Sequence, residues 1–165
     1  MIELLVIDVD GTLTDGKIIY SNSGEEFKNF HVRDGFGLVY WTKQLGKKAA
    51  IITGRNSKIV ENRAKELGFT HYYQGIKDKL AALDEILEKE NLTYANVAVI
   101  GDDINDISMM EHAKLSFCPS DASEYVLKTA NIVSKYKGGE GAVREMIEYI
   151  LRLQDMEEEF ISQWV

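Results

Sequence analysis

Short apolar runs alternate with amphipathic stretches along the whole chain. The apolar runs predict buried strands at Glu3–Ile7, Lys48–Ile52, His71–Tyr73, Val97–Ile100 and Leu115–Phe117, with a weaker strand near Ile132. Apolar positions at helical spacing predict helices at about Gly35–Leu45, Ser57–Leu67, Asp78–Glu90, Asn105–Glu111, Ser123–Lys128 and Gly141–Leu153. This alternation is typical of an α/β fold in which a doubly wound, Rossmann-like and mostly parallel sheet carries helices on both faces.

A hairpin interrupts the alternation after the first strand. Two short alternating runs flank the turn residues Ser21-Asn22-Ser23-Gly24, which predicts a small β-hairpin flap over about residues 17–30. Gly46 and Gly68 are expected as left-handed residues at helix ends, and Asn56 as the N-cap of the second helix. Because the chain has 165 residues and no repeat or linker, we expect a single domain over 1–165.

Composition narrows the class of partner. The net charge of -8 repels a phosphate backbone and argues against general nucleic-acid binding. The longest apolar runs are too short to cross a bilayer, and the first residues lack the basic segment of a signal peptide. The only cysteine, Cys118, is expected to be buried and cannot form an internal disulfide. We therefore expect a soluble, cytoplasmic protein without a membrane or nucleic-acid partner.

Two carboxylates follow the first strand. Asp8 and Asp10 are two residues apart, so on an extended segment they point to the same side and converge on one pocket. Like charges held this close need a cation or a shared proton, and Mg²⁺ is a hard cation that takes oxygen ligands. On these residues alone, an ordinary Asp-Gly turn is an equal alternative.

Further polar groups stand after the later strands, and in open parallel sheets ligands bind beyond these carboxyl ends. They comprise Thr53, Gly54 and Arg55, then Lys79, then Asp102, Asp103 and Asp106. Each alone could be a turn or a solvated surface group, but their ordered arrival at successive strand ends favours a site for phosphoryl transfer. In that chemistry Asp8 suits a nucleophile and Asp10 a proton donor and acceptor.

These ordered residues resemble the four motifs of the haloacid dehalogenase superfamily of phosphotransferases. The resemblance implies that Asp8 is the nucleophile and a Mg²⁺ ligand, and that Asp10 is the acid/base and a ligand through its carbonyl oxygen. It also implies phosphate binding by Thr53, Gly54 and Lys79, a third metal ligand in Asp102, and support of the metal shell by Asp103 and Asp106. The presence of Asp10 favours a phosphatase, because superfamily dehalogenases lack this acid.

The chain has no room for the cap domain that closes most of these phosphatases. Between Gly11 and the first helix there is only the hairpin, and between Thr53 and Lys79 only one helix and one strand. Residues 30–37, 51–55, 74–79 and 138–145 resemble the capless subgroup represented by 3-deoxy-D-manno-octulosonate 8-phosphate phosphatase, which serves lipopolysaccharide synthesis. The resemblance implies a homotetramer in which hairpins meet centrally, while neighbouring subunits and a C-terminal closing segment at about 138–165 complete each site.

The same resemblance assigns substrate contacts to Asp10, His31, Val32, Arg33, Asp34, Gly35, Arg55, Arg63 and Lys79. Three of these have structural alternatives: a helix-capping role for His31, an ion pair with Asp34 for Arg33, and a solvated helix charge for Arg63. Val39 stands where the subgroup often has arginine.

Two other functions stay open. One is a phosphatase of a nine-carbon 2-keto-3-deoxy sugar acid 9-phosphate, although by the same resemblance Arg55 fits the eight-carbon enzyme. The other is a non-catalytic binding or regulatory protein on the same fold. Independently, Phe160, Ile161 and Trp164 make the acidic C-terminal tail aromatic, and we expect it to dock on its own or a neighbouring subunit.

Overall fold

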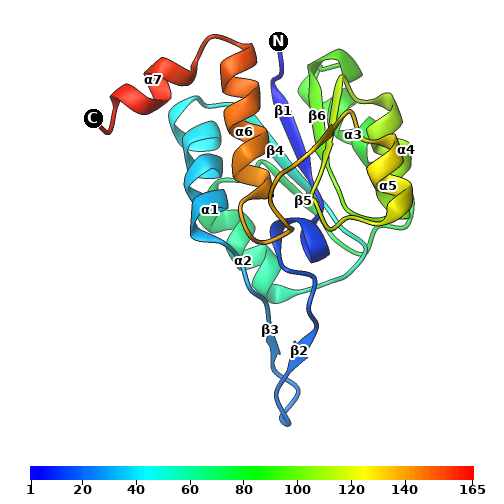
Figure 1. The fold of residues 1–165 in the computed structure, drawn as a ribbon. Helices are drawn as coiled ribbons and strands as arrows, with labels where there is room; N and C mark the ends of the chain where they lie inside the picture. Colours follow the sequence, from blue (N-terminus) through cyan, green and yellow to red (C-terminus); the bar gives the residue numbers. More distant parts are fainter.

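Six strands of mostly buried residues form one sheet at the centre of the computed structural model, which describes residues 1–165 (Figure 1). Every neighbouring pair of strands is parallel, and the order is β5-β4-β1-β6-β7-β8. The strands are β1 Leu4–Ile7, β4 Lys48–Ile52, β5 His71–Tyr73, β6 Val97–Ile100, β7 Leu115–Cys118 and β8 Ile132–Val133. The predicted strands are confirmed, with ends that shift by one residue at most.

The alternation of side chains along each strand divides the core between the two faces of the sheet. In β1, Leu5 and Ile7 enter one core with α1 Val32–Val39, α2 Lys58–Leu67 and α6 Ala142–Leu153. Leu4 and Val6 enter the other core with α3 Lys79–Glu90, α4 Ile107–His112 and α5 Glu124–Thr129. Figure 1 shows these helices on opposite sides of the sheet, which confirms the doubly wound α/β fold.

The predicted hairpin projects beyond the carboxyl ends of the strands (Figure 1). Its strands are β2 Ile19–Tyr20 and β3 Glu26–Phe27, which pair antiparallel with Ile19 opposite Phe27. A bridge between Thr14 and Phe30 closes its base. Between β4 and α3 the chain forms only α2 and β5, so no cap domain is built over the sheet.

The boundaries of α1 and α2 differ from the sequence prediction in three places. Helix α1 begins at Val32, three residues before the predicted start, because the side chain of His31 accepts a hydrogen bond from Arg33 N at 3.2 Å. The predicted continuation to Leu45 holds only as a separate π-helical turn over Tyr40–Gln44. At α2 the N-cap position is Ser57, not Asn56, and it makes no side-chain cap bond.

The C-terminal tail forms a short helix, α7 Glu157–Ser162, that packs on its own chain. Phe160 is only 4% exposed, and its ring lies 4.6 Å from that of Tyr40 and 6.1 Å from that of Phe36. The predicted docking of the tail is thereby confirmed within one chain. Cys118 is buried as expected. None of the helices is both long enough and apolar enough to pass through a membrane.

Candidate active site

A small polar pocket lies where the order of the parallel strands reverses, between β1 and β6. At such a point the chain leaves neighbouring strands toward opposite faces, which opens a crevice beyond their carboxyl ends. The pocket has a volume of about 160 Å³ and no hydrophobic lining residue. Its lining consists of Asp8, Asp10, Thr53, Gly54, Arg55, Asp102, Asp103 and Asn105. Seven of these eight residues are ones that the sequence predicted.

A tight turn after β1 brings the residues that follow β1 into contact with Asp102, which follows β6. Gly11 has a φ of +97°, and a Cβ atom there would overlap the carboxylate of Asp102. The next residue, Thr12, is fully buried and donates a hydrogen bond from its hydroxyl to Asp102 Oδ1 at 3.0 Å. Glycine is therefore required at the turn because backbone approaches a carboxylate there.

A buried lysine contacts two of the carboxylates at this site, those of Asp8 and Asp106. Lys79 is the first residue of α3, and its side chain is 1% exposed. Its Nζ donates to Asp8 Oδ1 at 2.7 Å and to Asp106 Oδ1 at 2.6 Å. Burial lowers the pKa of Lys79, but the two carboxylates outweigh burial and hold the pKa above its usual value. The lysine therefore stays charged and fixes the position of Asp8.

The acidic turn after β6 is built around Asp106. Its Oδ2 accepts hydrogen bonds from the backbone N–H groups of Asp102 at 3.0 Å and Asp103 at 3.3 Å. Asp103 in turn accepts from Ile104 N at 2.8 Å and so caps the short 104–106 turn. Asp106 thus has its oxygens engaged by Lys79 and by backbone, whereas Asp102 stays directed at the pocket.

The donor set fits a divalent cation. Carboxylate oxygens of Asp8, Asp102 and Asp106 lie within 4.8 Å of one another. Burial, with repulsion from Asp106, raises the pKa of Asp8 well above its usual value and raises that of Asp102 to about 6. One lysine does not neutralise three carboxylates, and hard oxygen ligands of this kind suit Mg²⁺. Asp106 is already engaged by Lys79 and by backbone, so Asp8 and Asp102 are the side chains that would hold the ion; their role as ligands stays a prediction.

Asp10 has a partner that the sequence did not reveal. Lys28, from the hairpin, places Nζ 2.5 Å from Asp10 Oδ1. Arg55 places Nε 3.9 Å from Asp10 Oδ2 and donates from Nη2 to Tyr20 Oη at 3.0 Å. Alternation puts Glu26 and Lys28 on the same face of the hairpin, which was the one available signal, but it does not say which face turns toward the sheet.

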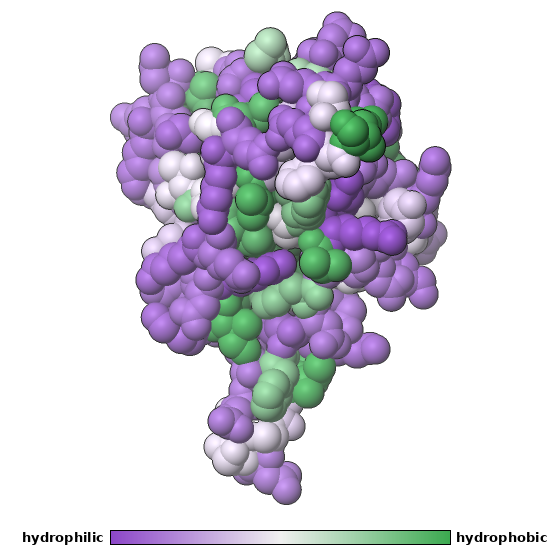
Figure 2. All heavy atoms as spheres, turned by 90° about the vertical axis from the view of Figure 1, so that its left-hand side faces the viewer, coloured by the Kyte–Doolittle hydropathy of each residue, from purple (hydrophilic) through white to green (hydrophobic).

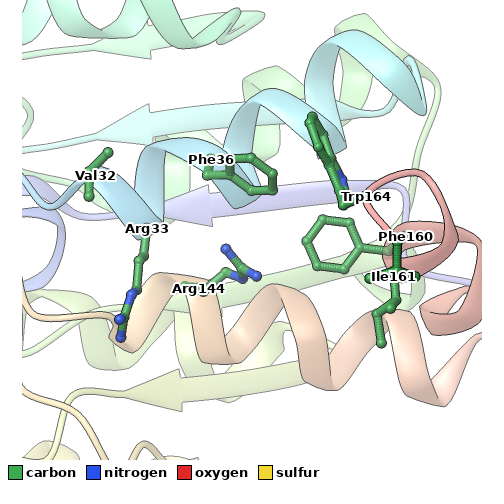
Figure 3. Close-up of a pocket in the computed structure, with 8 residues that line it drawn as sticks. Val32, Arg33, Phe36, Arg144, Phe160, Ile161 and Trp164 are labelled. Carbon is green, nitrogen blue, oxygen red and sulfur yellow. The ribbon is translucent and has the colours of Figure 1, made fainter.

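The predicted substrate residues 31–35 lie outside the carboxylate pocket. The His31 side chain caps α1, and Asp34 Oδ1 accepts from Arg144 N at 2.8 Å at the start of α6. Val32 and Arg33 line a separate cavity of about 450 Å³ between α1, α6 and α7 (Figure 3). A role for this stretch in binding substrate stays a prediction that involves a neighbouring subunit.

Arg63 also lies outside the carboxylate pocket. It pairs with Glu66 at 2.9 Å, and its guanidinium carbon lies 5.4 Å from the centre of the Phe30 ring. Gly35 lies so close that a Cβ atom there would press against the Arg63 side chain. Arg63 is therefore mostly buried beside α1, not exposed on its helix, and does not line the carboxylate pocket.

Comparison with known proteins gives consistent matches. The family described as haloacid dehalogenase-like hydrolase matches residues 74–147. The 3-deoxy-D-manno-octulosonate 8-phosphate phosphatase KdsC of Escherichia coli is 46% identical over 154 residues, which cover 93% of this chain and 81% of the relative. The protein of the same name from Yersinia pestis is 46% identical over 155 residues, with 93% and 82% covered.

Two solved phosphatase structures are also similar to this chain. The phosphatase of this name from Moraxella catarrhalis, in complex with magnesium, phosphate and KDO, has a TM-score of 0.96 and 41% identity, covering 99% of this chain and 94% of its own. The cobalt-bound deoxy-D-mannose-octulosonate 8-phosphate phosphatase from Haemophilus influenzae has a TM-score of 0.90 and 35% identity, with 97% and 93% covered.

Proposed function

Because the chain belongs to the 3-deoxy-D-manno-octulosonate 8-phosphate phosphatase family of haloacid dehalogenase-like hydrolases, we propose that it hydrolyses this sugar acid phosphate. The products are the free sugar acid and inorganic phosphate, and the reaction depends on Mg²⁺. The observation that carries the proposal is the 46% identity over 93% of the chain, joined to a pocket that brings together Asp8, Asp10 and Asp102.

In the first step, the Asp8 carboxylate attacks the phosphorus atom. An O–P bond forms to Asp8 while the bond between phosphorus and the C8 oxygen of the sugar breaks. Asp10 gives its proton to the leaving oxygen, so the sugar acid departs as an alcohol. Lys79 fixes the attacking carboxylate, and Thr53 and the Gly54 backbone lie in the pocket where they can donate to the phosphoryl oxygens.

In the second step, water cleaves the aspartyl-phosphate. Asp10, now ionised, takes a proton from that water as its oxygen attacks phosphorus, and the bond to Asp8 breaks. Phosphate leaves, and both carboxyl groups return to their starting states. Asp8, Asp102 and the main-chain carbonyl of Asp10 would hold Mg²⁺, which when bound neutralises charge on the phosphoryl oxygens.

The size of the sugar is the closest alternative. A nine-carbon 2-keto-3-deoxy sugar acid 9-phosphate has the same reacting group, and Arg55 is the pocket residue that favours the eight-carbon compound. Catalytic efficiency should be measured on both compounds with Mg²⁺ and with excess chelator. We expect preference for the eight-carbon phosphate and loss of turnover with chelator. A clear preference for the nine-carbon compound would contradict the substrate proposed here.

The nucleophile is tested by Asp8→Asn. This variant should lose all measurable Mg²⁺-dependent phosphate release, because an amide cannot form the aspartyl-phosphate. Unchanged turnover would show that Asp8 is not the nucleophile. Total inactivity of the wild-type chain toward phosphate monoesters would instead support a binding protein on this fold.

We also propose a homotetramer that works in the cytoplasm and serves lipopolysaccharide synthesis. The support for assembly is an apolar surface on the hairpin, where Ile18, Tyr20 and Phe27 are 49%, 58% and 50% exposed, with Val32 80% exposed above it. Figure 2 shows apolar side chains gathered on the hairpin and on the face above it. Exposed apolar groups at this density are typical of an interface.

Light scattering should give the mass of a tetramer for the wild type and a smaller mass for Phe27→Lys. Tyr125→Lys is the matched control, because Tyr125 is 68% exposed on α5, away from the hairpin. A monomeric wild type would contradict the assembly, and with it any contact of residues 31–35 or Arg63 with a neighbour's substrate.

A further inference from the structure

Four charged side chains connect the hairpin to the active site. Lys28 is the central one: its side chain is 2% exposed, and its Nζ lies 2.5 Å from Asp10 Oδ1 and 3.2 Å from Glu26 Oε1. Arg55 completes the set, with Nη2 3.5 Å from Glu26 Oε1 and Nε 3.9 Å from Asp10 Oδ2. We call Asp10, Glu26, Lys28 and Arg55 the flap cluster.

The geometry of the flap cluster fixes the plane of the Asp10 carboxylate. Lys28 donates to Oδ1, whereas Arg55 Nε lies 3.9 Å from Oδ2, beyond hydrogen-bond distance, which leaves Oδ2 free to carry the proton that Asp10 gives and takes. Rotation about the side chain would break the hydrogen bond to Lys28. Glu26 faces both cations and counters their mutual repulsion. The side chain of Lys28 is 2% exposed and that of Asp10 is 18% exposed, so their charged hydrogen bond is stronger than one in open water.

An acid/base must be placed accurately to work. Misplacement of a catalytic group by about 1 Å can cost about a hundredfold in rate, and supporting residues are what hold such a group in place. Asp10 sits on the turn after β1, whereas Lys28 comes from a hairpin with no fully buried residue. A buried lysine needs a partner for its charge, and Asp10, at 2.5 Å, is the nearer of the two carboxylates that Lys28 contacts.

We propose that Lys28 is a positioning residue for Asp10, and that Glu26 holds Lys28 and Arg55 in place for this purpose. The hairpin is then part of the catalytic apparatus as well as a surface for assembly. This role rests on the proposed function, in which Asp10 gives a proton to the sugar oxygen and later takes one from water.

The leaving group separates this role from a purely structural one. A sugar alkoxide needs a proton in order to leave, whereas 4-nitrophenolate leaves well without one. Loss of acid positioning therefore lowers kcat/KM much more for the sugar acid phosphate than for 4-nitrophenyl phosphate. A lysine that only anchors the hairpin would change both values by the same factor.

The experiment compares Lys28→Met, Lys28→Arg and a control, Lys47→Met. Lys47 is a suitable control because its side chain is 9% exposed and pairs with Glu3 at 2.9 Å, beside the opposite ends of the strands. For Lys28→Met we expect kcat/KM on the sugar acid phosphate to fall about 10- to 100-fold, and on 4-nitrophenyl phosphate by less than about threefold. Lys28→Arg should recover part of the difference, and Lys47→Met should keep both values within about twofold.

Equal losses on the two substrates would overturn the positioning role. Glu26→Gln gives a second test if Lys28→Met fails to fold, because the glutamine leaves Lys28 in place but weakens its support. We expect a smaller loss there that is again confined to the sugar acid phosphate, and equal losses would again overturn the role. A wild type inactive on the sugar acid phosphate contradicts the proposed function and this role together, whereas an active wild type with equal losses in the variants contradicts only the role of Lys28.

Discussion

Replacing Lys79 with methionine removes the one cation buried among the carboxylates. The side chain is 1% exposed, and its Nζ lies 2.7 Å from Asp8 and 2.6 Å from Asp106. Methionine has a similar length and keeps the apolar contacts of the stem, so the change isolates the charge. Asp8 and Asp106 then face each other without a positive group between them.

The cost follows from these distances. Each contact contributes about 6 kcal/mol of attraction at an effective dielectric constant of about 20. Desolvation of the buried charges offsets most of this attraction, and removing one partner of a buried ion pair costs about 3–5 kcal/mol. For a chain of this length each kcal/mol corresponds to about 2–4 °C, so we expect Tm to fall by about 6–20 °C.

The assay is thermal unfolding in excess chelator and again with saturating Mg²⁺. Lys79→Met should gain more in Tm from Mg²⁺ than the wild type gains, because the ion supplies the missing positive charge. Lys128→Met is the control, since its side chain is 70% exposed in a pair with Glu124 and its loss should change stability by less than about 1 kcal/mol. A Lys79→Met protein as stable as the wild type in chelator would refute the reasoning.

Three other changes test the structure. Burial raises the pKa of Asp102 from 3.8 to about 6. The contribution of this carboxyl group to stability is therefore full below about pH 4 and is lost as the pH rises through 6. Asp102→Asn should flatten that part of a curve of Tm against pH measured in excess chelator. Gly11→Ala should abolish turnover, because the added Cβ atom displaces Asp102. Gly24 also has a positive φ, +87°, but a Cβ atom there meets nothing within 4 Å, so Gly24→Ala should cost about 1 kcal/mol of stability and leave turnover intact. Equal activities of the two variants would contradict the close approach at Gly11. Phe160→Ala should lower the free energy of unfolding by about 3 kcal/mol and expose the C-terminal tail to proteases. Ile161→Ala is the control, because Ile161 is half-exposed. A Phe160→Ala protein as resistant to proteases as the wild type would refute the packing of the tail.

The strands and the motif residues could be predicted because their signals are local. A buried parallel strand such as Val97–Ile100 is a continuous apolar run, and the polar group that follows it marks the strand end. The convergence of Asp8, Thr53 and Asp102 then follows from the rule that parallel strands end at one edge of the sheet. None of these inferences needs the relative position of distant side chains.

The contacts of Lys28 and Asp34 could not be predicted, because they depend on how separate elements face one another. Alternation predicts a hairpin with Glu26 and Lys28 on one face, but not the direction in which the hairpin folds back, so it could not identify Asp10 as the partner of Lys28. Similarly, Asp34 accepts a backbone hydrogen bond from Arg144, which is 110 residues away. A carboxylate that caps a distant helix looks in sequence like one that binds a ligand.

The contact between Gly138–Gly139 and the turn after β1 limits where the protein can vary. A Cβ atom on Gly138 would overlap the carbonyl oxygen of Gly11, and Gly139 N donates to the carbonyl oxygen of Thr12 at 3.0 Å. Two loops more than 120 residues apart thus meet backbone to backbone, and no side chain between them can adjust to a change in either. Loops normally tolerate insertion and substitution, but these two form a fixed unit. Redesign of the substrate range would therefore have to work through hairpin side chains outside the flap cluster, which can change without moving Asp8 or Asp10.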